Sequence, residues 1–216
     1  MESEEKDAVY TCYHCGNTGL LRYIGQTSWK NADMDIAPNG IVYNYFLIEH
    51  EDWNILECPV CHKPVVIREY TFDANDGIPE ISIEFPKSPI HKDGVPGEIA
   101  SAFESAVKTK GIDSAICLLS LRRVLEMICK DKGATGNNLE AKIKYLINEK
   151  ALPEMFDDAC WIIRKLGNEA AHADKAKFSD YDTEQVIDFL STIIEYLYSV
   201  PVRIAKMKER LSSLDK

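Results

Sequence analysis

Two Cys-x-x-Cys pairs constrain this chain more strongly than any other feature of its sequence. Cys12 and Cys15 form the first pair, Cys58 and Cys61 form the second, and the 42 residues 16–57 separate them. Each pair makes a tight turn that directs two sulfur atoms to one point, and two pairs supply the four ligands of a tetrahedral zinc site. The sequence therefore predicts one structural Zn²⁺ held by these four cysteines, with no open position for a catalytic water.

The other cysteines and the nearby histidines have simpler interpretations. His14 and His62 lie within or beside the two pairs and are alternative ligands, although four cysteines already suffice. An odd number of cysteines and the absence of a secretion signal at the acidic N-terminus predict a reducing, cytoplasmic location. Three single cysteines lie in apolar, helix-like stretches and are expected to be small buried residues: Cys117, Cys129 and Cys160.

The sequence changes character near residue 90, which indicates two domains. A linker rich in Pro and Gly follows the change, and the sequence after it has a helical pattern. We therefore expect a small β zinc ribbon over residues 1–90 and an all-α bundle over residues 95–216, in the α+β class. The long insert between the cysteine pairs is expected to form its own hairpin. Before the change, β-branched and aromatic runs predict strands at residues 40–48, 65–72 and 81–85.

Apolar residues recur at helical spacing throughout the second domain. Asp113, Asn137 paired with Glu140, and Asp182 are the expected N-caps of three of its helices. Pro201 is expected to kink or split the last helix. The pattern predicts five helices, at about residues 96–110, 113–132, 138–149 and 153–172, and from Asp182 to about Leu214.

The charge of the chain limits its partners. The 216 residues include 35 Asp and Glu against 25 Lys and Arg, for a formal net charge of −10. This balance disfavours bulk attraction to nucleic acid or to an anionic membrane. No window approaches the roughly 18 apolar residues of a membrane helix, so no membrane contact is expected. Acidic residues in the insert favour contact with protein: Asp33, Asp35, Glu49, Glu51 and Asp52.

The fourth predicted helix carries a polar stripe. Arg164, Asn168 and His172 are spaced by four residues and share one helical face. An Arg binds phosphate, a His moves a proton near neutral pH, and an Asn orients either, which suits a metal-free phosphodiester site. The alternative is structural, with Arg164 in a salt bridge and the other two bonded to loops or capping the helix end. Gly167 indicates close approach by another helix or a bound backbone.

Residues 96–208 resemble the family catalogued as domain of unknown function 4145 (DUF4145). The cysteine ribbon in front is similar to that of many members. This family is similar to the HEPN superfamily of helical bundles, which often dimerise and include metal-independent ribonucleases of prokaryotic defence and stress systems. The resemblance implies that Arg164 would stabilise a phosphate, His172 would handle the proton of the ribose 2′-hydroxyl, and Asn168 would orient the site. Four segments carry it: residues 103–106, 121–126, 139–143 and 164–172.

Two functions remain open at this point. The first is a HEPN-type endoribonuclease that cleaves RNA in prokaryotic defence or stress, with its site at a homodimer interface of the helical domain. The second is a non-catalytic module whose ribbon and bundle bind a protein of a restriction or defence system. The gap between Arg164 and His172 is longer than the family's usual one, and with the net charge of −10 it favours the second. The shared helical face of Arg164 and His172 within a HEPN-like bundle favours the first, and the sequence as a whole leans slightly to this nucleic-acid-directed function. A nucleotide-binding module lacks support, since the sequence has no Gly-rich phosphate loop.

Overall fold

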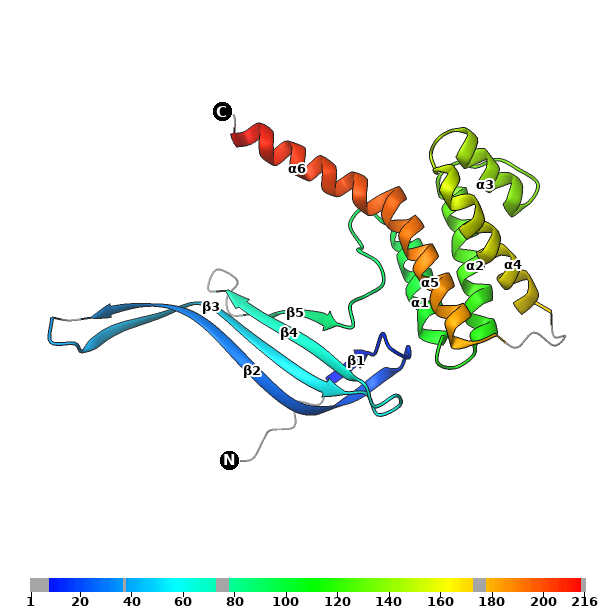
Figure 1. Ribbon diagram of the computed structural model, residues 1–216. Coiled ribbons are helices and arrows are strands. Elements are labelled where there is room, and N and C mark those ends of the chain that lie inside the picture. The colour runs from blue at the N-terminus through cyan, green and yellow to red at the C-terminus, as the bar shows by residue number, and fades with distance from the viewer. Residues whose placement is uncertain (1–7, 37, 73–77, 173–177, 215–216) are drawn as a thin grey trace. The chain divides into compact units, whose positions relative to one another are not determined.

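The chain divides into two units, Met1–Ser88 and Pro89–Lys216, and each is described by itself. The structure is a computed structural model that describes residues 8–36, 38–72, 78–172 and 178–214 (Figure 1). An antiparallel sheet makes up the first unit and helices make up the second, which confirms the α+β class. Within the described ranges, every helix is too short or too polar to cross a lipid bilayer.

The β unit is one five-stranded antiparallel sheet in which each strand pairs with the next along the chain. The β2–β3 register runs from Arg22 opposite Glu57 to Ile36 opposite Val42, so the insert between the cysteine pairs folds as a long hairpin, as expected. The predicted strands fall in the last three of the five. These strands are β1 (Ala8–Thr11), β2 (Thr18–Ile36), β3 (Val42–Glu57), β4 (Pro64–Phe72) and β5 (Glu80–Phe85).

The core of the β unit contains the cysteine pairs. Leu56 of β3 pairs in register with Val65 of β4, and both side chains are buried. The next residue on β3, Ile55, is exposed, as the period of two in a half-buried strand requires. Cys12 and Cys58 are fully buried in the same cluster as these apolar side chains. The candidate metal ligands therefore belong to the packed core of this unit.

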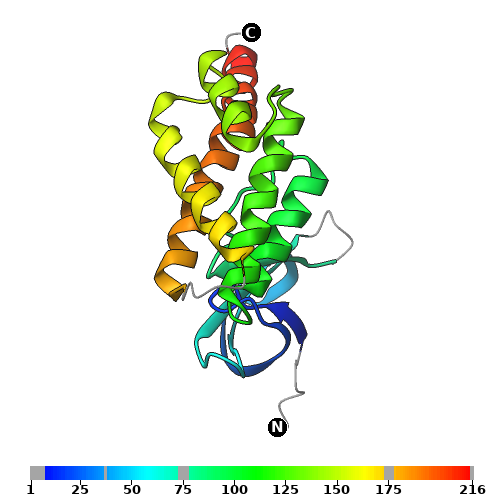
Figure 2. The same ribbon diagram turned by 90° about the vertical axis from the view of Figure 1, so that its right-hand side faces the viewer.

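The helical unit follows the predicted order of helices (Figures 1 and 2). A short 3-10 turn, η2 (Glu154–Phe156), precedes the fourth helix, and a π-helical segment, η3 (Glu195–Ser199), separates the last two. The helix was expected to kink or split at Pro201; the change to π-helical geometry precedes it, and Pro201 itself lies in the first turn of α6. The α-helices are α1 (Gly97–Thr109), α2 (Ser114–Asp131), α3 (Leu139–Asn148), α4 (Asp157–Ala170), α5 (Asp180–Ile194) and α6 (Val200–Leu214).

Polar side chains cap three of these helices. Asp113 accepts a backbone hydrogen bond at the start of α2, as predicted. The other two predicted caps are wrong. Asn138, not Asn137, caps α3 and accepts the backbone N–H three residues later at 2.8 Å. Ser179, not Asp182, caps α5, and the Asp182 carboxylate accepts the Ser179 N–H at 2.9 Å in a reciprocal capping box.

Helix α2 lies at the centre of the bundle, where it contacts α1, α3, α4 and α5. Leu118, Leu121, Leu125 and Ile128 of α2 are buried in the core as their helical spacing predicts. The prediction that the single cysteines are buried is confirmed as well. Burial raises the pKa of these thiols, to about 11 for Cys117 and Cys129 and to about 12 for Cys160.

Helices α4 and α2 approach each other closely at Gly167 of α4. A Cβ atom on Gly167 would lie 2.5 Å from the Cβ of Arg122 on α2, which confirms the expected approach of another helix. Gly167→Ala gains about 1 kcal/mol of helix propensity, but overpacking costs about 1–3 kcal/mol. We expect a net loss of about 1 kcal/mol in the free energy of unfolding, measured by urea denaturation. The matched control Gly97→Ala has open space around its new methyl group and leaves stability unchanged or slightly higher.

Candidate metal centre and the Arg164 pocket

Two tight turns of the backbone present the four cysteines. In the first turn, the Cys12 carbonyl accepts the N–H of Cys15 at 3.3 Å and of Gly16 at 2.7 Å. In the second, the Cys58 carbonyl accepts the N–H of His62 at 2.9 Å. Gly16 (φ +79°) and His62 (φ +56°) follow the second cysteine of their pairs and adopt the same left-handed conformation. The two turns are therefore equivalent, with His62 in a position that favours glycine.

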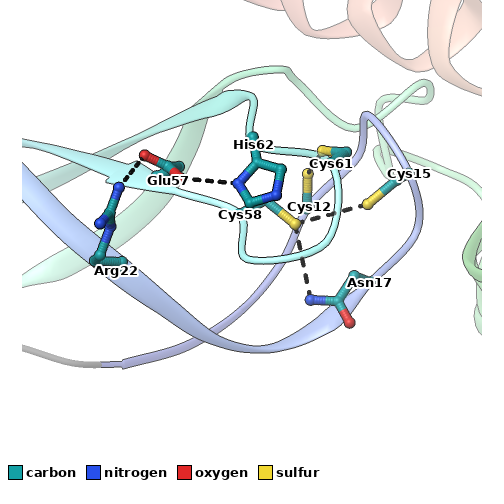
Figure 3. Close-up of polar contacts among 8 residues, drawn as sticks. All are labelled: Cys12, Cys15, Asn17, Arg22, Glu57, Cys58, Cys61 and His62. Carbon is teal, nitrogen blue, oxygen red and sulfur yellow. Dashed lines mark hydrogen bonds and ion pairs between the residues drawn. The ribbon is translucent and has the colours of Figure 1, made fainter.

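The four sulfur atoms face one another at the spacing of a tetrahedral metal site (Figure 3). All four Sγ atoms lie within 4.8 Å of one another. The sulfurs of Cys12 and Cys61 are 3.7 Å apart, and those of Cys15 and Cys58 are also 3.7 Å apart. A Zn–S bond of about 2.3 Å places tetrahedral sulfurs about 3.8 Å apart. The predicted residues thus lie together and can hold a metal ion.

The protein environment shifts the pKa values of three of these thiols, and not all in the same direction. Burial raises the pKa of Cys12 and of Cys15. Burial acts in the same direction on Cys58, but hydrogen bonds from the backbone of Cys61 and Val60 outweigh it and lower the Cys58 pKa to about 7. The side-chain amide of Asn17 also donates to the Cys58 sulfur, at 3.8 Å (Figure 3). Because a metal binds the thiolate, the lowered pKa makes Cys58 a readier ligand at neutral pH than Cys12 or Cys15.

The two histidines near the turns bond elsewhere. His14 Nε2 lies 3.1 Å from the carbonyl oxygen of Pro64. His62 Nδ1 lies 3.1 Å from the carboxylate of Glu57, which also pairs with Arg22 (Figure 3). In the part of the chain that the structure describes, the group of candidate ligands contains the four cysteines alone.

Helix α4 places Arg164 in a small pocket beside α3, with a volume of about 340 Å³. Arg164 Nη1 donates to Glu140 Oε2 at 2.7 Å, and the same carboxylate accepts from Lys144 at 3.0 Å. Lys144 and Arg164 together lower the pKa of Glu140. Three carboxylates and two cations face this pocket, so it repels a phosphate more than it attracts one. Its other lining residues are Ile143, Asp157, Asp158 and Trp161.

Asn168 and His172 lie on the surface and do not line the pocket of Arg164. The fourth helix was expected to reach His172, but α4 ends at Ala170 and Ala171 is its C-cap. The backbone N–H of His172 donates to the Glu169 carbonyl at 3.1 Å, and the side chains of Asn168 and His172 are exposed. Among the described residues, no hydrogen bond or ion pair joins any two of Arg164, Asn168 and His172. The proposed shared site of Arg164, Asn168 and His172 therefore stays a prediction.

Sequence reasoning missed the acidic neighbours of Arg164. Glu140 lies 24 positions away in sequence, and its sequence context pointed only to a capping box with Asn137. Asp157 and Asp158 stand in the first turn of α4, where acidic residues are ordinary. Two of the acidic residues that were expected to favour protein contact, Asp33 and Asp35, have side chains that the structure does not describe.

A comparison with known proteins bears on the helical unit. The family described as "Domain of unknown function (DUF4145)" matches residues 104–210, which extend from α1 into α6. No curated protein and no solved structure matches the chain. The match covers all but the first eight residues of the stretch 96–208 in which the sequence resembled this family, and it supports the assignment of the helical unit to the DUF4145 family.

Proposed function

We propose that this protein is a non-catalytic interaction protein of a prokaryotic defence or restriction system. In this role the β unit is a zinc ribbon, the helical unit is a HEPN-like bundle, and they bind a protein partner in the cytoplasm. The observation that carries the proposal is the ion pair between Arg164 and Glu140. It occupies the guanidinium that a metal-independent ribonuclease would need for the phosphate.

Charge around Arg164 supports a protein partner over RNA. Asp157 and Asp158 line the same pocket as Glu140. An RNA strand approaching Arg164 would meet these carboxylates, and a chain with a net charge of −10 provides no long-range attraction to compensate. A protein surface with basic or neutral polar groups meets no such barrier.

The metal in this proposal is a structural Zn²⁺ bound by the four cysteines. Thiolates are the ligands that zinc prefers in closed structural sites, and four of them fill its tetrahedral shell. A site of this kind leaves no position for water or substrate. The ion would instead join the β1–β2 turn to the β3–β4 turn and supply folding energy that so small a sheet lacks.

A metal-independent ribonuclease built from two copies of the chain is the second candidate. The exposure of Asn168 and His172 favours it, because both side chains can reach a second copy or an RNA strand. Such a homodimer would have to release Arg164 from Glu140 or use the second copy's arginine. Releasing Arg164 would break at least one charge-assisted hydrogen bond, the one to Glu140.

RNA cleavage distinguishes the two candidates. We expect the purified chain to leave single-stranded and double-stranded RNA intact in buffer without divalent cations, with no 2′,3′-cyclic phosphate product detected by gel and mass spectrometry. Arg164→Ala and His172→Ala should behave like the unaltered protein. The exposed neighbour Lys165→Ala serves as the control. Cleavage that both variants abolish and Lys165→Ala retains would establish the ribonuclease instead.

A further inference from the structure

Helix α6 carries a row of apolar side chains that nothing in the described structure covers. The spacing between successive members of the row is alternately four and three residues, which is the heptad pattern of a coiled-coil seam. None of the residues of α6 is buried. We call the row the α6 seam. It comprises Val200 (37% exposed), Ile204 (50%), Met207 (53%), Leu211 (50%) and Leu214 (72%).

The opposite side of α6 is held against the helical unit. Lys206 lies 3.4 Å from the Asp93 carboxylate. Val202 packs so closely on Gly94 that a Cβ there would lie 2.5 Å from a Val202 methyl group. Both α6 residues occupy heptad positions away from the seam. The seam therefore has a fixed direction, and α6 leaves the bundle beyond η3 (Figure 1).

At its first turn the seam leads into a groove of about 560 Å³. Val200 and Ile204 belong to both the seam and the groove. The apolar surface thus continues from α6 onto η3 and onto the turn before η2, so a helix lying along the seam has a pocket for one end. Other residues of the groove include Ala151, Tyr196, Leu197 and Pro201.

Basic residues flank the seam. Arg203, Lys208 and Arg210 occupy the heptad positions next to it, and no ion pair of the described chain involves them. Across its whole length α6 has four basic residues and one acidic residue, Glu209, although the chain has a net charge of −10. The seam is therefore an apolar surface with a local positive rim.

These charges decide which occupant fits. A second copy of α6 would place Arg203 opposite Lys208 in a parallel pair, and an antiparallel pair would also bring like charges together. Helices that lie on anionic membranes bury a wide apolar face. The seam is the narrow type, confined to the two core positions of each heptad in Val200–Leu214. An acidic amphipathic helix satisfies both the apolar row and the basic rim.

We propose that the α6 seam binds an amphipathic α-helix of a partner protein, with Leu or Ile in its own heptad core and Glu or Asp at the flanking positions. This inference rests on the proposed interaction function and adds the surface and the class of partner. The two helices would form a short coiled coil, and the groove at η3 would receive one end of the partner.

Binding of a synthetic helix to the full chain tests this proposal. The probe is a fluorescent peptide of about three heptads with Ile and Leu in its core and Glu at the flanking positions; its matched form has Lys in place of Glu. We expect fluorescence anisotropy to show binding of the acidic peptide at least about tenfold tighter than of the basic one. Ile204→Ser should weaken acidic-peptide binding about tenfold or more. The control Ile112→Ser alters an equally apolar side chain, 82% exposed and outside the seam, and should bind normally.

Reversing the charge of the basic rim provides a second test of the proposal. Arg203→Glu combined with Arg210→Glu should shift the preference to the basic peptide, whereas Arg123→Glu on α2 should not. Equal binding of the two peptides, or binding of neither, would overturn the proposal. So would self-association in sedimentation that Ile204→Ser removes, or binding to phosphatidylserine vesicles that this variant loses. RNA cleavage reports separately on the interaction function, so failure of either proposal is recognisable.

Discussion

Replacing Cys58 with Ser will unfold the β unit while the helical unit of the same chain stays folded. Cys58 is fully buried and its thiol has a lowered pKa of about 7, so its loss removes a thiolate ligand from the candidate metal site. Zinc binding contributes about 10–16 kcal/mol in small zinc domains, and that free energy is also folding free energy. Hydrogen exchange with mass spectrometry should show lost protection across β2–β4 and unchanged protection in α2 and α4.

Metal content and a matched cysteine complete this test. Native mass spectrometry should find one zinc ion per chain in the unaltered protein and none in Cys58→Ser. Cys117→Ala removes an equally buried thiol in α2 and should keep the zinc ion. If Cys58→Ser loses the metal but β2–β4 keep their protection, the ion has no structural role.

Alkaline solution will destabilise the helical unit. The folded chain raises the thiol pKa of Cys117 and Cys129 to about 11 and that of Cys160 to about 12, from an ordinary value of 9.0. Below pH 9 the thiols are protonated in both states and their stabilising contribution is complete. Above it, the unfolded chain releases protons that the folded chain retains, so the free energy of unfolding falls until about pH 11–12. At pH 10.5 the loss is about 2 kcal/mol per thiol.

Urea denaturation followed by helical circular dichroism at pH 8 and pH 10.5 measures this loss. Cys160→Ala should show a smaller decrease between the two pH values than the unaltered chain, because it has one thiol fewer to titrate. The phenol of Tyr198, whose pKa burial and its hydrogen bond to Asp131 raise, acts in the same direction and remains in the variant. An identical decrease in both proteins would show that Cys160 does not titrate on unfolding.

The helices were predictable from sequence because the signals that define them, apolar spacing and N-cap residues, lie within or next to each helix. Apolar residues at helical spacing placed α2, and Asp113 marked its start. The start of α5 was misplaced by three residues because Asp182 also resembles an N-cap. The structure uses Ser179 as the cap and Asp182 as its reciprocal partner, a box in which Asp replaces the usual Glu.

A hairpin in the insert was expected, but the extent of its first strand, β2, and the surroundings of Arg164 were not predictable because they depend on distant partners. Thr18–Ile36 is too polar to suggest a strand, and cross-strand contacts such as Ser28 with Asp52 come only with the β3 register. Likewise, Glu140 meets Arg164 only when α3 packs on α4. The cysteine cluster was predictable because a Cys-x-x-Cys turn creates most of its own geometry.

The π-helical segment Glu195–Ser199 has a consequence for how the orientation of the α6 seam can change in evolution. A π turn takes more residues than an α turn, and one residue corresponds to about 100° of rotation about a helix axis. The insertion or deletion of one residue in this segment would therefore rotate α6 relative to α5 and re-aim the seam, with every residue of the seam unchanged. The direction from which a partner approaches is thus set within η3, whereas the seam residues that recognise the partner helix lie beyond it in α6.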